Sequence, residues 1–223
     1  LLVLEKRYLK KDASGRPVES PEDMFRRIAK NIASADLLYN KRADIVSQEE
    51  QFYDLLTSLQ FLPNSPTLMN AGRDLQQLFG CFVLPIEDSI DSIFDTVKQA
   101  ALIHKSGGGT GFSFSRIRPK NDMVSTSGGC ASGPISFMKV FNEATEAINQ
   151  GGFRRGANMA VLRIDHPDIL DFIKIKQNEG VLTNFNISVG VTNAFMDAVE
   201  KNQDFPLINP RTRTVVKILH ARE

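Results

Sequence analysis

One of the two cysteines of this chain, Cys81, lies in the apolar run "QLFGCFVLP" at 77–85. A cysteine in such a strand-like segment could fill a core, bind a metal or act as a reactive thiol. Free cysteine is among the most buried residue types and behaves as a small hydrophobe, so this stretch alone favours a buried, inert side chain. The three histidines show no paired spacing, which argues against a zinc site.

Glycine marks further candidate sites, because ten of the 15 glycines lie between 107 and 156, in "SGGGTG", "SGGCASG" and "QGGFRRG". Glycine is favoured where φ is positive or where the backbone approaches a ligand closely. Three clusters predict loops shaped around a ligand, gathered at one end of a sheet. The segment "KSGGGTGFSFS" lacks the ending of a Walker A loop and leads into a strand, so it fits either a ligand loop or a helix-to-strand connection with Gly107 at the helix C′ position.

The segment "NQGGFRRGANM" (149–159) places Gln150, Arg154 and Arg155 among three glycines, between a predicted helix and a predicted strand. Flexible backbone with forked guanidinium donors suits recognition of phosphate or of nucleobase edges. A solvated basic turn is the other interpretation of this segment.

Composition limits the class of protein. The chain has 223 residues, 42% hydrophobic and 24% charged, enough for one large domain or two small ones. A net charge of +1 provides no general attraction to nucleic acid or to a membrane, so an anion site must be local. No apolar stretch approaches the roughly 20 residues of a membrane span, and no signal peptide is visible at the start. Two cysteines cannot form a secreted-type disulfide framework, so we expect a cytoplasmic location.

These residues must be positioned by two kinds of region. The first sixty residues predict helices, one capped by Ser20 and a second over 48–60, and a loop follows over 61–74. After residue 75, strand and helix alternate, which is typical of an α/β domain with a largely parallel sheet. The predicted strands are 78–85, 111–118, 157–164 and 185–191, the predicted helices are 88–105, 132–148, 166–176 and 193–201, and "VVKILHARE" at the end reads as a strand running into a helix.

Six segments, in this order, resemble the large catalytic subunit of ribonucleotide reductases: "FLPNSPTLMNAG", "CFVLPIEDSIDSIFD", "HKSGGGTGFSFSRIRP", "GGCASGPISFMKVF", "INQGGFRRGANMAVL" and "NFNISVGVT". The opening "RYLKKDASGRPVESPEDMFRRIA" is most similar to the adenosylcobalamin-dependent (class II) branch. The resemblance implies an α/β fold, with a helical region at 1–62 followed at 63–223 by about the first half of a ten-stranded α/β barrel that continues beyond 223.

The resemblance also implies a function, the reduction of ribonucleotides to 2′-deoxyribonucleotides by thiyl-radical chemistry. Cys81 matches the first cysteine of the redox-active pair. Ser65 and Gly80 match substrate-contacting positions beside it, and Gly109 matches a position near the ribose or phosphate. The implied cofactor is adenosylcobalamin, and the implied reductant is a thiol protein such as thioredoxin.

Allosteric control is implied in the same way. Asp88, Ser89, Ile90 and Arg118 match a specificity site for a deoxynucleoside triphosphate effector at the interface of a homodimer, and 119–127 match the first effector loop. Gln150 and Arg154 match the loop that relays the identity of the effector to the substrate base.

The sequence departs from the family in lacking the Asn-x-Cys-x-Glu motif of the radical cysteine, the second redox cysteine and the shuttle cysteines. We therefore expect this chain to lack turnover until the remainder of the barrel is supplied. Cys130 has no assigned role. A metal-dependent class I large subunit and a non-catalytic nucleotide-binding fragment are the alternative interpretations.

Overall fold

The structure is a computed structural model that describes residues 2–124, 128–149, 156–177 and 180–222. By its internal contacts the chain forms two compact units, unit 1 over Leu1–Gly80 and unit 2 over Cys81–Glu223. This division lies farther along the chain than the boundary expected after residue 62, because helix α4 packs with the other helices of unit 1.

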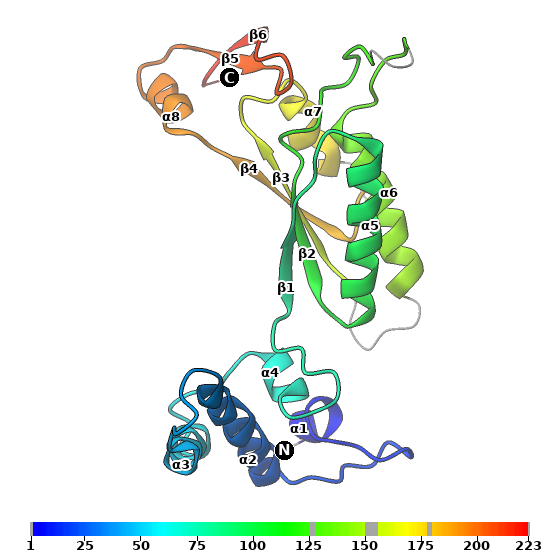
Figure 1. Ribbon diagram of the computed structural model, residues 1–223. Helices are drawn as coiled ribbons and strands as arrows, with labels where there is room; N and C mark the ends of the chain where they lie inside the picture. The colour runs from blue at the N-terminus through cyan, green and yellow to red at the C-terminus, as the bar shows by residue number, and fades with distance from the viewer. Residues whose placement is uncertain (1, 125–127, 150–155, 178–179, 223) are drawn as a thin grey trace. The chain divides into compact units, whose positions relative to one another are not determined.

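Unit 1 is helical, as expected (Figure 1). Its elements are α1 (Leu2–Arg7), α2 (Pro21–Ala33), the 3-10 helix η1 (Ser34–Leu38), α3 (Ile45–Thr57) and α4 (Ser65–Asn70). Ser20 caps α2 in a complete capping box with Asp23, as its position before Pro21 predicted. The loop predicted over 61–74 is wrong at α4, where the Asn64 side chain accepts a hydrogen bond from the Thr67 backbone N–H at 2.9 Å and so caps the helix.

Unit 2 contains a four-stranded parallel sheet in the order β1-β2-β3-β4, with each strand pair joined through a helix (Figure 1). The elements in chain order are β1 (Cys81–Leu84), α5 (Ile90–Lys105), β2 (Gly109–Ser113), α6 (Pro134–Asn149), β3 (Asn158–Arg163), α7 (Ile169–Lys174), the 3-10 helix η2 (Ile175–Gln177), β4 (Phe185–Gly190) and α8 (Asn193–Glu200). The predicted alternation of strand and helix is confirmed. Gly107 has φ +82° directly after the last turn of α5, as expected at a C′ position.

The core of unit 2 lies between the sheet and helices α5 and α6, which pack against one another on one face of it (Figure 1). Four rings meet there, with centroid distances of 4.6 to 6.5 Å: Phe112, Phe114, Phe141 and Phe185. This aromatic cluster fixes α6 against the middle of the sheet. The loops that connect strands and helices lie at the two ends of the strands.

An antiparallel hairpin of β5 (Asp204–Ile208) and β6 (Val215–His220) follows the parallel sheet. The sequence did not predict this pairing. The expected passage from strand to helix at the end of the chain is wrong, because β6 ends at His220 and a turn follows at 221–222. No helix among the described residues is long and apolar enough to cross a membrane.

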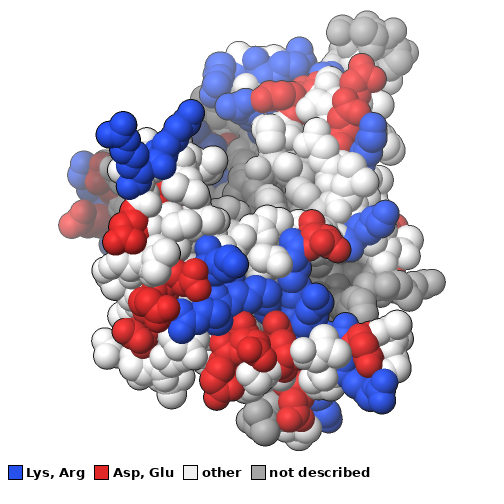
Figure 2. Space-filling model, turned by 60° about the horizontal axis from the view of Figure 1, so that its bottom comes forward, with Lys and Arg blue, Asp and Glu red and all other residues white. Residues whose placement is uncertain are grey.

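Charged side chains of both signs lie next to one another on the face shown in Figure 2. In unit 1, Glu19 binds two arginines, with 2.8 Å to Arg27 and 2.9 Å to Arg73. Burial acts to raise the pKa of Glu19, but the hydrogen bonds from Arg27, the Lys10 backbone and Arg73 outweigh it and lower the pKa.

Candidate functional site

The predicted effector residues come together in one cavity of unit 2, which we call the Arg118 cavity. It has a volume of about 580 Å³ and lies beyond the carboxyl ends of β1 and β2, the edge at which α/β sheets bind ligands. Its lining comprises Asp88, Ser89, Ile90, Asp91, Ile93, Ile117, Arg118, Val124, Cys130, Ala131, Ser132, Gly133 and Phe137. Asp88, Ser89, Ile90 and Arg118 are thus neighbours in space although β2 and α5 separate them along the chain.

Asp88 and Arg118 form the central ion pair of this cavity. The Arg118 Nε donates to Asp88 Oδ2 at 2.7 Å, and the Arg118 backbone N–H donates to Asp88 Oδ1 at 3.2 Å. Both side chains are about one-fifth exposed, so the guanidinium is held in place and still reaches solvent. A fixed, accessible guanidinium is a suitable partner for a phosphate oxygen.

Helix α5 begins at the wall of the same cavity. Ser89 is its N-cap, and the Ser89 hydroxyl accepts a hydrogen bond from the Ser92 backbone N–H at 3.2 Å. The first turn of a helix carries partial positive charge, which favours an anion in front of it. Asp91 adds a carboxylate to the wall, and such a group can accept hydrogen bonds from sugar hydroxyls.

The chain that follows Arg118 doubles back to form a further wall. Met123 and Cys130 pair as an antiparallel bridge. Asp122 anchors this segment to the β5–β6 turn through Arg211, whose guanidinium donates to its carboxylate at 3.0 to 3.2 Å. That hydrogen bond lowers the pKa of Asp122. Of the effector loop expected over 119–127, residues 125–127 lie outside the described part.

The cavity also includes residues that the sequence left without a role, above all Cys130 and Phe137. Cys130 is an exposed free thiol. No local pattern could have placed it beside Arg118, because the pairing that brings it there joins two ends of a loop.

Cys81 lies at the opposite, amino end of the sheet. It is the first residue of β1, it is paired in register with Gly109, and its thiol is free and exposed. The buried side chain that the local pattern favoured is therefore wrong for the described part of the chain, where β1 is an edge strand of the parallel sheet and only alternate side chains face the helices. Gly80 precedes Cys81 directly.

Ser65 belongs to unit 1, where it is the first residue of α4 and its hydroxyl lies 3.0 Å from that of Tyr8. Gln150 and Arg154 lie outside the described residues. Among the predicted substrate positions, the structure therefore brings Cys81 and Gly109 together within unit 2.

A buried chain of hydrogen bonds supports this amino end. The Thr110 hydroxyl donates to Asn158 Oδ1 at 2.7 Å and lies 2.9 Å from His104 Nε2. Because the hydroxyl proton of Thr110 is donated to Asn158, the hydroxyl oxygen accepts a hydrogen bond from His104 Nε2, which therefore carries a proton. The Asn158 amide donates to Thr145 Oγ1 at 2.8 Å, and that hydroxyl donates to the Phe141 carbonyl at 2.7 Å. Burial lowers the pKa of His104, which favours the neutral ring, with its one proton on Nε2 in this pattern.

The expectation that the glycine clusters gather at one end of the sheet is wrong. The cluster "SGGGTG" leads into β2 at the amino end, whereas "SGGCASG" precedes α6 at the carboxyl end (Figure 1). The two clusters lie at opposite edges because parallel strands place the start and the end of each connection at opposite edges of the sheet.

The sequence matches the family descriptions "ribonucleotide reductase, all-alpha domain" over residues 1–76 and "ribonucleotide reductase, barrel domain" over residues 79–223. The chain belongs to the ribonucleotide reductase family. Its helical unit and its parallel α/β unit therefore correspond to the all-alpha domain and to part of the barrel of ribonucleotide reductases.

Among named ribonucleotide reductases, the chain is 46% identical to the vitamin B12-dependent ribonucleoside-diphosphate reductase of Thermoplasma acidophilum, over 99% of this chain and 36% of that protein. It is 50% identical to the enzyme of the same description from Mycobacterium tuberculosis (strain CDC 1551), over 99% of this chain and 32% of that protein. The ribonucleoside-diphosphate reductase subunit alpha of Helicobacter pylori (strain J99) is 36% identical over 80% of this chain. The chain spans about a third of the length of the B12-dependent relatives.

Proposed function

We propose that this chain is the N-terminal part of an adenosylcobalamin-dependent ribonucleoside-diphosphate reductase, which reduces ribonucleotides to 2′-deoxyribonucleotides. The observation that carries the proposal is the free, exposed thiol of Cys81 at the start of β1, opposite Gly109. The family and the B12-dependent relatives support the same assignment. The activity belongs to the complete enzyme, of which this chain forms part.

In the proposed reaction Cys81 is one of two thiols that reduce the ribose. A separate cysteine radical outside this chain activates the substrate, the C2′–O bond breaks, and the oxygen leaves as water. The two thiols supply two electrons and two protons and become a disulfide, which a thiol protein such as thioredoxin then reduces. Cys81 suits this role because a thiol must be accessible both to the substrate and to its partner cysteine.

The Arg118 cavity is the proposed specificity site for a deoxynucleoside triphosphate. Arg118 and the amino end of α5 would bind phosphate oxygens, and the carboxylates of Asp88 and Asp91 would accept hydrogen bonds from the sugar. We further propose that Gln150 and Arg154 relay the identity of this effector to the substrate base. In this assignment the effector cavity and Cys81 lie at opposite edges of the sheet.

We propose a homodimer as the working assembly. Helix α5 presents three exposed apolar side chains, with 60% of Ile90, 50% of Phe94 and 60% of Leu102 accessible. Exposed apolar side chains of this size are typical of surfaces that a second protein covers.

Adenosylcobalamin would supply the radical chemistry of the complete enzyme. The Arg118 cavity is lined by the proposed effector residues, and a second cavity of unit 2, of about 750 Å³, is lined mainly by charged and hydroxyl side chains, which do not match the broad, largely apolar face of a corrin ring. We therefore assign none of the described residues to the cofactor and derive no step through it.

The redox role is tested by replacing Cys81 with serine in the complete enzyme, supplied with adenosylcobalamin, effector and a thiol reductant. We expect loss of multiple turnover with unchanged binding of the triphosphate. Cys130→Ser removes the other thiol of this chain and, because Cys130 lines the proposed effector cavity, it is measured at saturating effector, where it should retain turnover. Normal activity of Cys81→Ser would refute the assignment. Absence of product with cobalamin, but activity with a separate metal-containing subunit, would favour the class I alternative.

The effector site is tested by Arg118→Ala, which removes the guanidinium from the cavity. We expect at least about tenfold weaker binding of the deoxynucleoside triphosphate, the effect of losing one charge-assisted hydrogen bond. Arg16→Ala removes an equal charge from an exposed site in unit 1 and should leave the affinity unchanged. Equal affinity of Arg118→Ala and the unmodified protein would contradict this site.

A further inference from the structure

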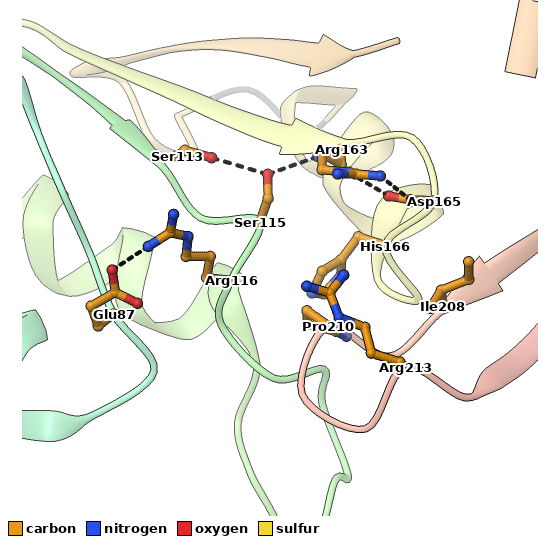
Figure 3. Close-up of a pocket in the computed structure, with 10 residues that line it drawn as sticks. All are labelled: Glu87, Ser113, Ser115, Arg116, Arg163, Asp165, His166, Ile208, Pro210 and Arg213. Atoms are coloured by element: carbon orange, nitrogen blue, oxygen red, sulfur yellow. Dashed lines mark hydrogen bonds and ion pairs between the residues drawn. The ribbon is translucent and has the colours of Figure 1, made fainter. Parts of the chain in front are cut away.

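A second polar cavity of unit 2, separate from the proposed effector site, lies beyond the carboxyl ends of β2 and β3 (Figure 3). We call it the Arg213 cavity. Its volume is about 750 Å³, and the β5–β6 hairpin forms one of its walls. The residues that line it are Glu87, Ser113, Ser115, Arg116, Arg163, Asp165, His166, Ile208, Pro210 and Arg213.

Three arginines from distant parts of the chain meet around this cavity, and two of them have carboxylate partners. Arg116 is paired with Glu87. Arg163 binds Asp165 through two hydrogen bonds of 2.9 and 2.5 Å. The lining therefore contains three cationic and two anionic side chains, so a positive charge is left uncompensated.

The uncompensated charge is Arg213. Within the part of the chain that the structure describes, its guanidinium makes no ion pair and no side-chain hydrogen bond, and in Figure 3 it points into the cavity beside His166. Its backbone has φ +63°, a conformation that residues other than glycine seldom adopt, and its N–H donates to the Asn209 carbonyl at 2.9 Å. The backbone of this turn is therefore held by a hydrogen bond, and it carries the cationic side chain of Arg213 at the cavity.

The other walls are rigid and offer neutral polar groups. The Ser115 hydroxyl accepts hydrogen bonds from the Arg163 backbone N–H at 3.0 Å and from the Ser113 hydroxyl at 3.1 Å. The His166 Nδ1 accepts from the Asp168 backbone N–H at 3.0 Å, so the proton lies on Nε2, which donates to the Ile117 carbonyl at 2.8 Å. Burial lowers the pKa of His166, so this ring adds no charge.

The β5–β6 hairpin is fixed to the sheet at this place. The Ile208 backbone N–H donates to the Asp165 carbonyl at 2.6 Å, which ties β5 to the end of β3. The distance between Arg213 and the arginines of the sheet is therefore set by backbone hydrogen bonds and not by side chains alone.

We propose that the Arg213 cavity binds a phosphate-bearing anion, at a site distinct from the effector site. Arg213 would be the primary ligand, and Arg116 and Arg163 would strengthen the attraction from the sheet. The volume is within the range of small-molecule sites and accommodates a diphosphate group with room for a substituent.

The two proposed sites share one segment of backbone. Arg116 and Arg118 are two residues apart and face different cavities, where they pair with the adjacent carboxylates Glu87 and Asp88. An anion that draws Arg116 away from Glu87 would therefore act on the segment that also carries Arg118.

Titration of the 223-residue chain with inorganic pyrophosphate, followed by calorimetry at constant ionic strength, tests the proposal. We expect saturable binding, and we expect Arg213→Gln to weaken it about tenfold or more, since one charge-assisted contact is lost. Arg213 is exposed and, among the described residues, its side chain makes no ion pair or hydrogen bond, so thermal unfolding of this variant should match that of the unmodified chain.

Two control variants make the outcome specific. Lys217→Gln removes one positive charge from an exposed position on the same hairpin, and Arg16→Ala removes one from an exposed position in unit 1. Both should leave pyrophosphate binding within about twofold of the unmodified chain, because neither lines the Arg213 cavity. The proposal is overturned by absence of saturable binding, by equal weakening in Arg213→Gln and Lys217→Gln, or by loss of binding in Arg118→Ala with unchanged binding in Arg213→Gln, since the pyrophosphate would then lie in the effector cavity. Failure at Arg118 in the triphosphate assay would leave this proposal intact.

Discussion

Replacing Thr110 with valine should destabilise unit 2 strongly although it changes the side-chain volume very little. The Thr110 hydroxyl is the link between His104 Nε2 and Asn158 Oδ1 in the buried hydrogen-bond chain below Cys81. Valine replaces that hydroxyl with a methyl group, so the packing is kept while both partners lose their bond. Thr110, His104 and Asn158 are all less than 5% exposed, so water cannot replace the hydroxyl without rearrangement.

The size of the effect follows from two buried polar groups left without a partner. Each such group costs about 1–3 kcal/mol, so we expect the free energy of unfolding to fall by about 2–4 kcal/mol, the lower part of the sum because neighbouring groups relax. His104 Nδ1 already has no hydrogen-bond partner within the described residues, so a change of tautomer would only move the proton to another nitrogen without a partner. With a urea dependence of about 2 kcal/mol/M, the unfolding midpoint should fall by about 1–2 M.

Urea unfolding at neutral pH, followed by far-ultraviolet circular dichroism, measures this change. Thr110→Ser is the matched control: it keeps the hydroxyl, loses one buried methyl group and should cost only about 1 kcal/mol. A valine variant within about 0.5 kcal/mol of the unmodified chain, or more stable than the serine variant, would refute the reasoning, because the hydrogen-bond chain would then contribute nothing to stability.

Three further outcomes can be measured by the same unfolding assay. Acid should destabilise the chain. Burial lowers the pKa of His104 and His166 in the folded state, so the unfolded chain binds more protons. The contribution of these two residues to the free energy of unfolding is therefore present above about pH 6.5 and is lost as the pH falls. Gly133→Ala should cost at least about 2 kcal/mol, since φ is +80° and a Cβ there would meet a carboxylate oxygen at 2.7 Å and a backbone nitrogen at 2.9 Å, whereas Gly128→Ala, with φ +66° and open space, should cost about 1 kcal/mol. Glu19→Gln should cost about 3 kcal/mol, because it leaves two half-buried arginines without their carboxylate; a change below about 1 kcal/mol would show that water replaces the ion pairs.

Features encoded by a few neighbouring residues were predicted from the sequence. Ser20 and Pro21 set the start of α2, and Gly107 ends α5 with a positive φ, because caps depend on local backbone geometry. Helix α4 was missed although Asn64 and Pro66 carry a helix-start signal, since two prolines and a glycine nearby favoured a loop.

Features that join distant segments could not be predicted in the same way. The ion pair of Asp88 and Arg118 spans 30 residues, and Arg211 reaches Asp122 across 89. Their positions depend on the register of the parallel strands and on the docking of the β5–β6 hairpin, which no local pattern encodes. The family resemblance named Asp88 and Arg118, whereas Arg211 and Arg213 became visible as candidates only in three dimensions.

Helix α5 spans the whole depth of unit 2, from its cap at the Arg118 cavity to His104 beside Thr110. Sixteen residues at 1.5 Å rise give a length of about 24 Å. This length connects the carboxyl edge of the sheet, where Ser89 caps the helix, to the amino edge, where His104 lies in its last turn. One helix therefore carries both a residue that lines the Arg118 cavity and the histidine that binds Thr110.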